Sequence, residues 1–425
     1  MIKTFEQSCC SNNYHNKLSE LDSLIYCKEL SYLYKKDKEG KPVYTFRIKK
    51  GEYLKTSYFV GVDWVDKNHK DKAIYVQPKQ NDTCKEIDVM KMLFEALQEH
   101  ENYKHLSDLC KIDFVDQPII IEQKQDLLSP FLIAQFLQIL KEIVRKGLKK
   151  TYYPVVNNLE AKVKGKILVN LTIKKNIYKN HITRNICKYD EFGYNGLENR
   201  ILKKALLFST KALSVFQMRD KFQELISYIS PAFEIVSDEI NVYNIKSFIP
   251  NPLYKEYERA IKLAKLILKR YSYNINQTNS QKIATPPFWI DMSKLFELYV
   301  YKYLRQIFKG QDEVIYQFNA GGRYPDFLIN NNDTKIVLDT KYKRNWDVGH
   351  IDDIRQICAY SRMKTVIKKL VKGTEIIDCL VISLDNDVYK DEEQNQVKIK
   401  EWKMKVNELS SYSRLYNVCI SLPVI

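Results

Sequence analysis

The stretch GGRYPDFLINNNDTKIVLDTKYK, residues 321–343, decides the fold of the C-terminal third of the chain. The β-branched and aromatic runs 324–329 and 335–343 flank a polar turn, which predicts two strands joined as a hairpin. Asp326 stands at the start of the first strand, and Asp339 ends the continuous apolar run KIVL of the second. If the strands pair across residues 330–334, Asp326 comes within reach of Asp339.

Three side chains of this hairpin form a candidate metal-dependent site. Alternate residues of a strand point to the same face, so the Asp339 carboxylate and the Lys341 ammonium should lie side by side. The carboxylates of Asp326 and Asp339, with a backbone carbonyl assigned to Thr340, would make an oxygen site suited to Mg²⁺ with several waters, or to Mn²⁺. A neighbouring lysine can orient or deprotonate a metal-bound water, while the metal polarises a scissile phosphate.

Each part of this pattern also has an ordinary structural interpretation. Pro-Asp is common in turns, and Asp-x-Lys on a strand is usually an exposed ion pair worth under about 1 kcal/mol. Three features favour the metal-site interpretation. Asp339 ends a strand that should be buried, an α-β-β-β-α-β order of predicted elements surrounds it, and the preceding helix carries Glu297 at the edge of its apolar stripe, where a further acid can face the site.

The surrounding sequence predicts a compact α/β domain over residues 286–425. Asp291 should cap a helix that runs to about residue 308, and strands are expected at 313–318, 324–329, 335–343 and 379–384. A second helix should begin near residue 352, and more strand is expected at 396–405. The order α-β-β-β-α-β gives two helices that flank a short mixed sheet, at a normal domain size.

The rest of the chain is expected to fold as two further regions, so the fold class is α/β within an α+β multidomain chain. Residues 1–140 should be β-rich, because β-branched and aromatic runs fill 43–80, although 86–110 and 129–147 have helical spacing. Residues 141–275 should be mainly helical, on the patterns at 196–230 and 253–271. Residues 167–173 fit either a strand or the start of a helix. The polar stretch 271–287 is the candidate linker.

Composition limits the partners and the compartment. The 425 residues include 68 Lys and Arg against 52 Asp and Glu, and this net charge of +16 favours a polyanionic partner such as nucleic acid. Nine cysteines without a CxxC pair argue against a zinc ribbon or a disulfide framework and suit a reducing cytoplasm. The N-terminus lacks an apolar signal segment, and the longest apolar stretch, 130–140, is too short to span a bilayer. We therefore expect a cytoplasmic protein.

Pro325-Asp326 followed by Asp339-Thr340-Lys341 resembles the PD-(D/E)xK nuclease motif. The wider region resembles the McrC family, the nuclease subunit of McrBC modification-dependent restriction systems. Other matching stretches are IDMSKLFELYVYKYL (290–304), DIRQICAYS (353–361), VKGKILVNLTIKKN (163–176) and YDEFGYNGLENRILKKAL (189–206). The resemblance covers about residues 145–385 and leaves residues 1–140 unmatched.

The resemblance implies an endonuclease subunit of an antiphage restriction complex, of the type IV-like, Mg²⁺-dependent kind. Asp326 and Asp339 would be metal ligands and Lys341 the catalytic lysine. At the helix positions that support such sites stand Glu297 and Gln356, and Gln356 could equally be a helix-surface residue. Contacts to DNA phosphate are expected from Lys343 and Arg344, whereas packing roles are expected for Tyr342 and Tyr360.

The resemblance also implies partners. These are double-stranded DNA that carries a modification such as 5-methylcytosine, a hexameric McrB-like AAA+ GTPase, and a second nuclease copy for cutting both strands. The N-terminal and middle regions would bind the motor. The chain has no GxxxxGKS or GxxxxGKT motif, so nucleotide hydrolysis must come from another chain. Two alternatives stay open: a non-catalytic activator of an AAA+ partner with a relic nuclease fold, and a motor-independent nuclease.

Two features of the middle region remain to be placed. Arg200, in a Glu-Asn-Arg triplet, is expected to pair with Glu198 or Asp190 and hold this region together. The basic residues at 145–150 and 162–166 either contact DNA or the motor, or form a solvated face.

Overall fold

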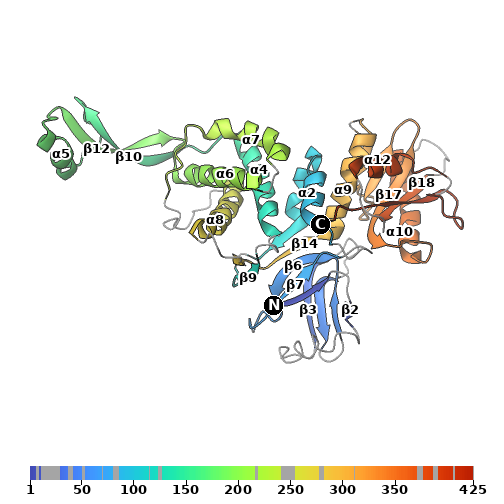
Figure 1. Cartoon of the computed structure of the whole chain (residues 1–425). Coiled ribbons are helices and arrows are strands. Elements are labelled where there is room, and N and C mark those ends of the chain that lie inside the picture. Colours follow the sequence, from blue (N-terminus) through green and yellow to red (C-terminus); the bar gives the residue numbers. More distant parts are fainter. Residues whose placement is uncertain are drawn as a thin grey trace. The chain divides into compact units, whose positions relative to one another are not determined.

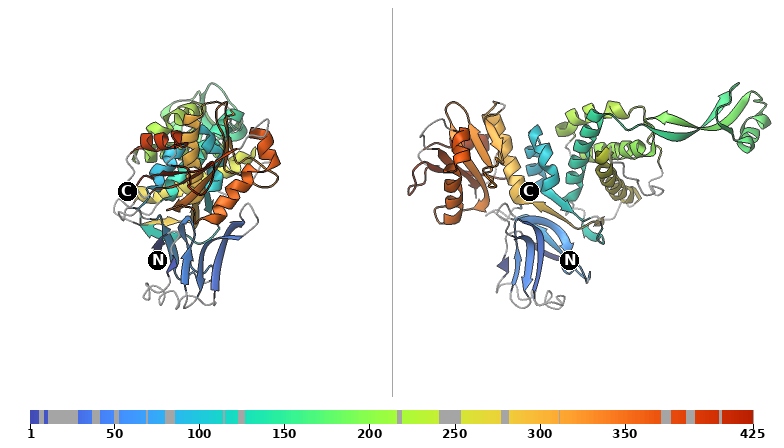
Figure 2. Two further views of the ribbon diagram at one scale, coloured as in Figure 1. Left: turned by 90° about the vertical axis from the view of Figure 1, so that its right-hand side faces the viewer. Right: turned by 180° about the vertical axis from the view of Figure 1, so that it is seen from behind.

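The computed structural model describes residues 1–5, 9–10, 29–36, 42–49, 53–68, 70–79, 86–113, 115–122, 127–215, 219–240, 254–276, 282–310, 312–370, 377–385, 391–404 and 407–424. The chain forms two compact units (Figures 1 and 2). The first unit contains Met1–Leu127 together with Ala284–Ile425, and the second contains Leu128–Ile283. The two ends of the chain share one unit, so this division differs from the three consecutive regions that the sequence predicts.

The N-terminal part of the first unit is built on two sheets, so the strands expected within 43–80 are confirmed. A five-stranded sheet has the order β1 (Ile2–Phe5), β7 (Ala73–Gln77), β6 (Phe59–Trp64), β14 (Phe288–Asp291) and β8 (Cys110–Ile112). A four-stranded sheet has the order β2 (Cys9–Cys10), β5 (Tyr53–Thr56), β4 (Pro42–Lys49) and β3 (Glu29–Lys36). Further elements of this part are α2 (Val89–Ala96), η1 (His100–His105), α3 (Leu106–Leu109) and β9 (Ile119–Glu122).

Strand β14 explains why the two ends of the chain share a unit. It lies directly before the first helix of the C-terminal region, yet it pairs antiparallel with β6 and β8, with Ile290 opposite Val60 and Cys110. A Cβ on Gly61 would lie 2.1 Å from the Phe288 carbonyl oxygen, so this close approach of the two strands requires glycine. The Trp289 indole adds a buried hydrogen bond to Asp63 (3.0 Å).

The C-terminal part of the first unit is a mixed α and β fold around a second five-stranded sheet. The sheet order is β15 (Val314–Tyr316), β16 (Phe327–Asn330), β17 (Lys335–Arg344), β18 (Asp378–Leu384) and β19 (Leu415–Ile420). Strands β15 to β17 are antiparallel, whereas β17, β18 and β19 run parallel. The helices are α9 (Met292–Ile307), α10 (Ile351–Ser361), α11 (Lys364–Leu370) and α12 (Glu392–Lys400). The predicted order α-β-β-β-α-β is present, with α11 added before β18.

Two expectations for this part have definite outcomes. Asp291 caps α9, since its side chain accepts a hydrogen bond from the Lys294 backbone N–H (3.0 Å), as predicted. The strand expected at 396–405 is wrong, because residues 392–400 form α12. Asp391 caps this helix, acidic residues fill its first turn and lysines its last, which matches the helix dipole. That charge order outweighs the strand-like alternation of the sequence.

The second unit combines a group of helices with a long β-ribbon. The helices are α4 (Leu128–Lys146), α6 (Leu197–Val215), η4 (Asp220–Phe222), α7 (Gln223–Ile229), η5 (Ser230–Phe233) and α8 (Lys255–Asn276). The boundary expected in the stretch 271–287 is confirmed, because the second unit ends at Ile283 and the first unit resumes at Ala284. Residues 271–276 of this stretch belong to α8, residues 282–285 form β13 (Lys282–Thr285), and residues 277–281 lie outside the described part. Within the described residues, no helix has the length and apolar character needed to cross a bilayer.

The ribbon departs from the mainly helical fold expected for residues 141–275. It pairs β10 (Thr151–Glu160) with β12 (Arg184–Gly193) along all ten residues of each, and β11 (Lys166–Ile167) adds a short third strand. Helices α5 (Val169–Lys175) and η3 (Ile177–Lys179) lie at its end, which reaches away from the helices of the same unit (Figures 1 and 2). Residues 167–173 thus contain both a strand end and a helix start.

The expected pairing of Arg200 is wrong. Its Nε donates to the backbone carbonyl (2.9 Å) and the side-chain oxygen (3.1 Å) of Asn195, while Glu198 pairs with Lys149 (2.8 Å). Residues two apart on a helix do not face each other, so Glu198 and Arg200 of α6 point to different neighbours. The neighbouring Asn199 accepts a hydrogen bond from the buried Tyr257 hydroxyl (2.8 Å), so the triplet has a structural role.

Candidate active site

The predicted hairpin forms and brings its two aspartates together. Strand β16 pairs antiparallel with β17, with Phe327 opposite Leu338 and Asn330 opposite Lys335. The side chain of Asn331 closes the turn by accepting a hydrogen bond from the Thr334 backbone N–H (2.7 Å). Asp326 immediately precedes β16, so this register places it opposite Asp339. Both carboxylates are buried, with 5% and 3% of their residue surface exposed.

Asp326 is held against strand β17 by Thr340. Its Oδ2 atom accepts hydrogen bonds from the Thr340 backbone N–H (2.8 Å) and from the Thr340 hydroxyl (2.7 Å). The N–H and C=O of a strand residue point toward the same neighbouring strand. The Thr340 carbonyl therefore points to the same side of β17 as Asp326. Strand β16 begins only at Phe327, so it does not cover this carbonyl. Carboxylate and carbonyl oxygens thus converge on this side.

Lys341 joins the hairpin to helix α10. Its Nζ lies 2.6 Å from Asp339 Oδ2, which confirms the expected side-by-side placement, and 3.6 Å from Asp353 Oδ1. It also donates to Gln356 Oε1 (3.0 Å), and the Gln356 amide in turn donates to the Tyr360 hydroxyl (2.9 Å). Gln356 therefore faces the cluster and is not simply a helix-surface residue.

The electrostatics of the cluster favour a charged lysine. Burial alone would lower the pKa of the Lys341 ammonium, but the carboxylates of Asp339, Asp353 and Asp326 outweigh it and raise this pKa above its usual range. Burial would raise the pKa of Asp353, yet Lys341 and Lys343 hold that pKa below its ordinary value. The hairpin and α10 thus share a compensated network of opposite charges.

Asp353 was missed by the sequence reasoning. Its Oδ2 accepts hydrogen bonds from Lys343 Nζ (2.7 Å) and from the Trp346 indole (3.0 Å). Spacing could have revealed it, because Asp353 and Gln356 are three apart on a helix, and Lys341 and Lys343 are two apart on a strand. Lys343 therefore forms an ion pair within the chain, and its contact with DNA phosphate stays a prediction.

Glu297 lies beside the cluster without touching the two aspartates directly. Its Oε2 accepts hydrogen bonds from Lys294 Nζ (3.0 Å), the Tyr316 hydroxyl (3.0 Å) and the Gln317 amide (3.1 Å). The Gln317 backbone N–H donates to the Asp326 carbonyl (2.8 Å), so Glu297 reaches Asp326 through one intervening residue. Its geometry suits positioning of the Asp326 end of the hairpin.

Of the remaining predicted residues, Tyr342 and Arg344 lie at the end of β17, and Tyr360 lies in α10. Tyr342 is buried against Phe296 (ring centroids 5.8 Å apart) and beneath Lys79 Nζ (3.5 Å from its ring centroid), as a packing role requires. Tyr360 is also buried. Arg344 is the last residue of β17, where the register with β18 shifts after Lys341. Arg344 still pairs with Leu384 at the C-terminal end of β17, which lies between β16 and β18 in the sheet.

Comparison of the chain with known proteins identifies its family. The family model described as "McrBC 5-methylcytosine restriction system component" matches residues 54–371 of the chain. The chain belongs to this McrBC family. The match begins at residue 54, so the expected limit of the resemblance near residue 145 was too narrow, and β5, β6 and β7 lie inside the family region of this McrBC chain.

Two solved structures that are similar to this McrBC chain come from Thermococcus gammatolerans. One is a half-complex from a tetradecameric assembly of McrB AAA+ hexamers with bound McrC, at 17% identity and a TM-score of 0.39, covering 99% of this chain and 94% of that one. Another is the McrBC complex, at 17% identity and a TM-score of 0.28, covering 73% and 89% of the two chains. No curated protein matches the sequence.

The donor atoms of the McrBC chain fit a hard divalent cation. Asp326 and Asp339 supply carboxylate oxygens, and the Thr340 carbonyl faces the same edge, which is the all-oxygen chemistry that Mg²⁺ accepts together with water ligands. Within the described part of the chain, no group of three or more His, Cys, Asp or Glu side chains is arranged to hold a metal. A cation here would depend on two carboxylates, a carbonyl and water.

Proposed function

We propose that this chain is the endonuclease subunit of an McrBC-type restriction complex and hydrolyses phosphodiester bonds of modified double-stranded DNA with Mg²⁺ or Mn²⁺. One observation carries the proposal: in a member of the McrBC family, Asp326, Asp339 and Lys341 converge at one end of the β16–β17 hairpin. The distances are those of direct hydrogen bonds and ion pairs. An exposed structural ion pair would not need burial, a second aspartate and an amide from α10.

Each residue has a role that its contacts support. Asp326, Asp339 and the Thr340 carbonyl would hold the metal, which when bound would polarise the scissile phosphate and lower the pKa of a water. The Lys341 ammonium offsets the negative charge that develops on phosphorus oxygens in the transition state. Gln356 and Asp353 fix the position of Lys341, and Glu297 supports Asp326 through Gln317. Lys343 and Arg344 extend the basic surface toward the DNA backbone.

The second unit would bind the AAA+ motor through its ribbon. Large apolar side chains are exposed along the ribbon and its end, in a density that monomeric proteins rarely leave in water. They are Tyr152, Val156, Val163, Val169, Leu171, Ile173, Ile177, Tyr178, Ile182 and Phe192. Apolar surface suits a protein partner better than a phosphate backbone, so we assign the ribbon to the motor, a McrB-like hexameric GTPase.

Cutting both strands of DNA requires two hydrolytic sites. A single set of Asp326, Asp339 and Lys341 can serve one scissile phosphate at a time, so two copies of this chain should meet on the assembled complex. Native mass spectrometry of the complex that makes double-strand breaks gives the copy number. A single copy in a fully active complex would contradict this part of the proposal.

A cleavage assay tests the whole proposal. Long methylated and unmethylated duplexes with Mg²⁺ are incubated with wild type, Asp339→Asn or Asp333→Asn, each with and without the AAA+ partner and GTP. The exposed Asp333 in the hairpin turn is the matched control. Cutting that needs the partner, survives in Asp333→Asn and vanishes in Asp339→Asn supports the proposal. Cutting by the chain alone would indicate a motor-independent nuclease, and stimulated GTP hydrolysis without cutting would indicate a non-catalytic activator.

A further inference from the structure

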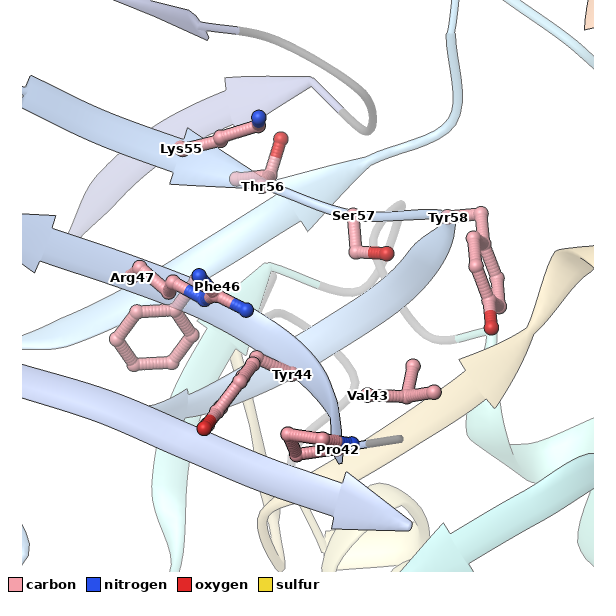
Figure 3. A pocket seen from close by; sticks show the side chains of 9 residues that line it. All are labelled: Pro42, Val43, Tyr44, Phe46, Arg47, Lys55, Thr56, Ser57 and Tyr58. Atoms are coloured by element: carbon pink, nitrogen blue, oxygen red, sulfur yellow. The ribbon is translucent and has the colours of Figure 1, made fainter. Parts of the chain in front are cut away.

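A pocket of about 380 Å³ lies in the N-terminal part of the first unit, on elements that do not contribute to the candidate active site. Strand β4 contributes Pro42 to Arg47, except Thr45, while β5 and the residues after it contribute Lys55 to Tyr58 (Figure 3). The volume falls in the range of about 300–1,000 Å³ that is usual for small-ligand sites. The Ser57 hydroxyl faces the space between Arg47 and Tyr58 in this view (Figure 3).

Three hydrogen-bond donors that line this pocket have no acceptor among the residues that the structure describes. Arg47 and Lys55 are exposed and stand directly opposite each other in the β4–β5 pairing, where like charges repel. Across the described residues, neither cation has a carboxylate within ion-pair distance, and the Ser57 hydroxyl has no acceptor. Two cations and a hydroxyl that line one pocket are suited to an anion with several oxygen atoms.

The aromatic lining narrows the class of anion. The Arg47 guanidinium carbon lies 4.0 Å from the centroid of the Tyr44 ring, which is a cation–π contact, and a guanidinium can also donate hydrogen bonds to phosphate oxygens. Tyr58 supplies a second ring, tilted against Phe59 with centroids 4.7 Å apart. Basic groups beside aromatic rings are the combination that binds nucleotides, with phosphate on the cations and the base against a ring.

We propose that this pocket binds a nucleotide unit, with its phosphate on Arg47, Lys55 and Ser57 and its base against the aromatic lining. An acidic peptide would use the two cations but would leave the rings without a role. The nucleotide can belong to a DNA strand or be free in solution, and both sources present the same phosphate and base. The proposal does not depend on the nuclease site, because none of the residues that line the pocket belongs to that site.

Binding to labelled oligothymidylate, measured by fluorescence anisotropy with the full chain in EDTA, tests the proposal. Arg47→Ala should weaken binding about tenfold and reduce the slope of log K against log salt by about one, the effect of losing one phosphate contact. Lys55→Ala should act similarly, and Arg47→Lys should lie between wild type and Arg47→Ala. Lys104→Ala removes the same charge from an exposed pair with Glu101 outside the pocket and should leave binding unchanged.

Competition identifies the source of the nucleotide. Displacement of the oligonucleotide by stoichiometric GTP or thymidine monophosphate indicates a free nucleotide, and displacement only by unlabelled strands indicates DNA. The proposal is overturned if Arg47→Ala and Lys55→Ala bind every nucleotide probe like Lys104→Ala. It is also overturned if polyglutamate binding, and not nucleotide binding, is lost in these variants. Since EDTA excludes metal-dependent cleavage, these results are independent of the outcome at Asp339.

Discussion

The cluster around Lys341 and the β10–β12 ribbon place their side chains in opposite environments. In the cluster, carboxylates and an ammonium are buried, and each charge has an opposite charge or a hydrogen-bond partner within the same unit. On the ribbon, tyrosine, phenylalanine, isoleucine and valine side chains are exposed to water. A buried polar cluster must be compensated within the chain, whereas an exposed apolar surface can be compensated by a partner.

This difference separates two kinds of function. The compensated cluster can hold its geometry before substrate arrives, which suits bond-breaking chemistry. If the ribbon docks on the proposed partner, its apolar surface would be covered only then, so substitutions in the ribbon should change partner binding and hardly change the stability of the free chain. Substitutions in the two regions should therefore affect different measurements.

The largest expected effect follows replacement of Lys341 by methionine, which keeps the aliphatic stem and removes the charge. Cleavage should fall on the order of 10³-fold, the scale of losing one group that stabilises charge in a transition state. Mg²⁺ affinity, measured by titration calorimetry, should rise, because the ammonium 2.6 Å from Asp339 competes for the same carboxylate. The exposed Lys309→Met is the control. Weaker Mg²⁺ binding, or cleavage within tenfold of wild type, would contradict the assignment of Lys341.

A matched pair of leucines tests burial itself. Leu338 is fully buried in β17, whereas Leu171 is 40% exposed in α5 at the end of the ribbon. Leu338→Ala should lower the free energy of unfolding by about 2–5 kcal/mol, from lost burial and the remaining cavity. Leu171→Ala should change it by less than about 0.5 kcal/mol. Urea unfolding followed by fluorescence compares the two, and equal losses would show that the ribbon end is packed within the chain.

The ribbon should respond in partner binding. Tyr178 and Ile182 are each 80% exposed near its end, and replacing both by serine should weaken binding to the AAA+ partner by roughly 30-fold or more, the scale of one interface hot spot. Tyr228→Ser with Ile235→Ser makes the same change at exposed positions elsewhere in the second unit. Surface plasmon resonance compares the two variants. Equal affinities would remove the ribbon from the interface.

The sequence could predict those features that depend on residues close to one another in the chain. The hairpin 321–343 was predictable because strand periodicity, turn residues and the Asp339–Lys341 spacing are all local. The Asp291 cap was local as well. Strand β14 was not, because its pairing with β6 joins residues more than 200 positions apart and leaves no pattern near Phe288. The ribbon was missed because its strands do not bury one face, so the usual alternation of apolar and polar residues is absent.

The site residues that belong to one local motif were predictable, whereas those brought together from different elements were not. Asp326, Asp339 and Lys341 form a motif with fixed spacing, and Gln356 follows from the family resemblance. Asp353 contacts Lys341 and Lys343 from another element, so recognising it required combining helix spacing on α10 with strand spacing on β17. The pocket at Arg47 has no sequence motif, since its residues meet only through the β4–β5 register.

The smallest expected effect concerns Gln356, which positions Lys341 and does not touch the aspartates in the hydrogen bonds described here. Gln356→Ala removes the acceptor of the Lys341 ammonium and should reduce the cleavage rate about tenfold, the scale of losing an outer-shell partner of a metal site. Gln356→Glu keeps an oxygen acceptor and should recover much of that loss, which a merely structural role would not predict.

Arg355→Ala, at an exposed neighbour on α10, should cut like wild type. Motor binding should be unchanged in all three variants, because α10 belongs to the first unit and the ribbon to the second. If Gln356→Glu cuts no better than Gln356→Ala, the hydrogen bond to Lys341 does not position it, and the lysine must be held by Asp339 and Asp353 alone.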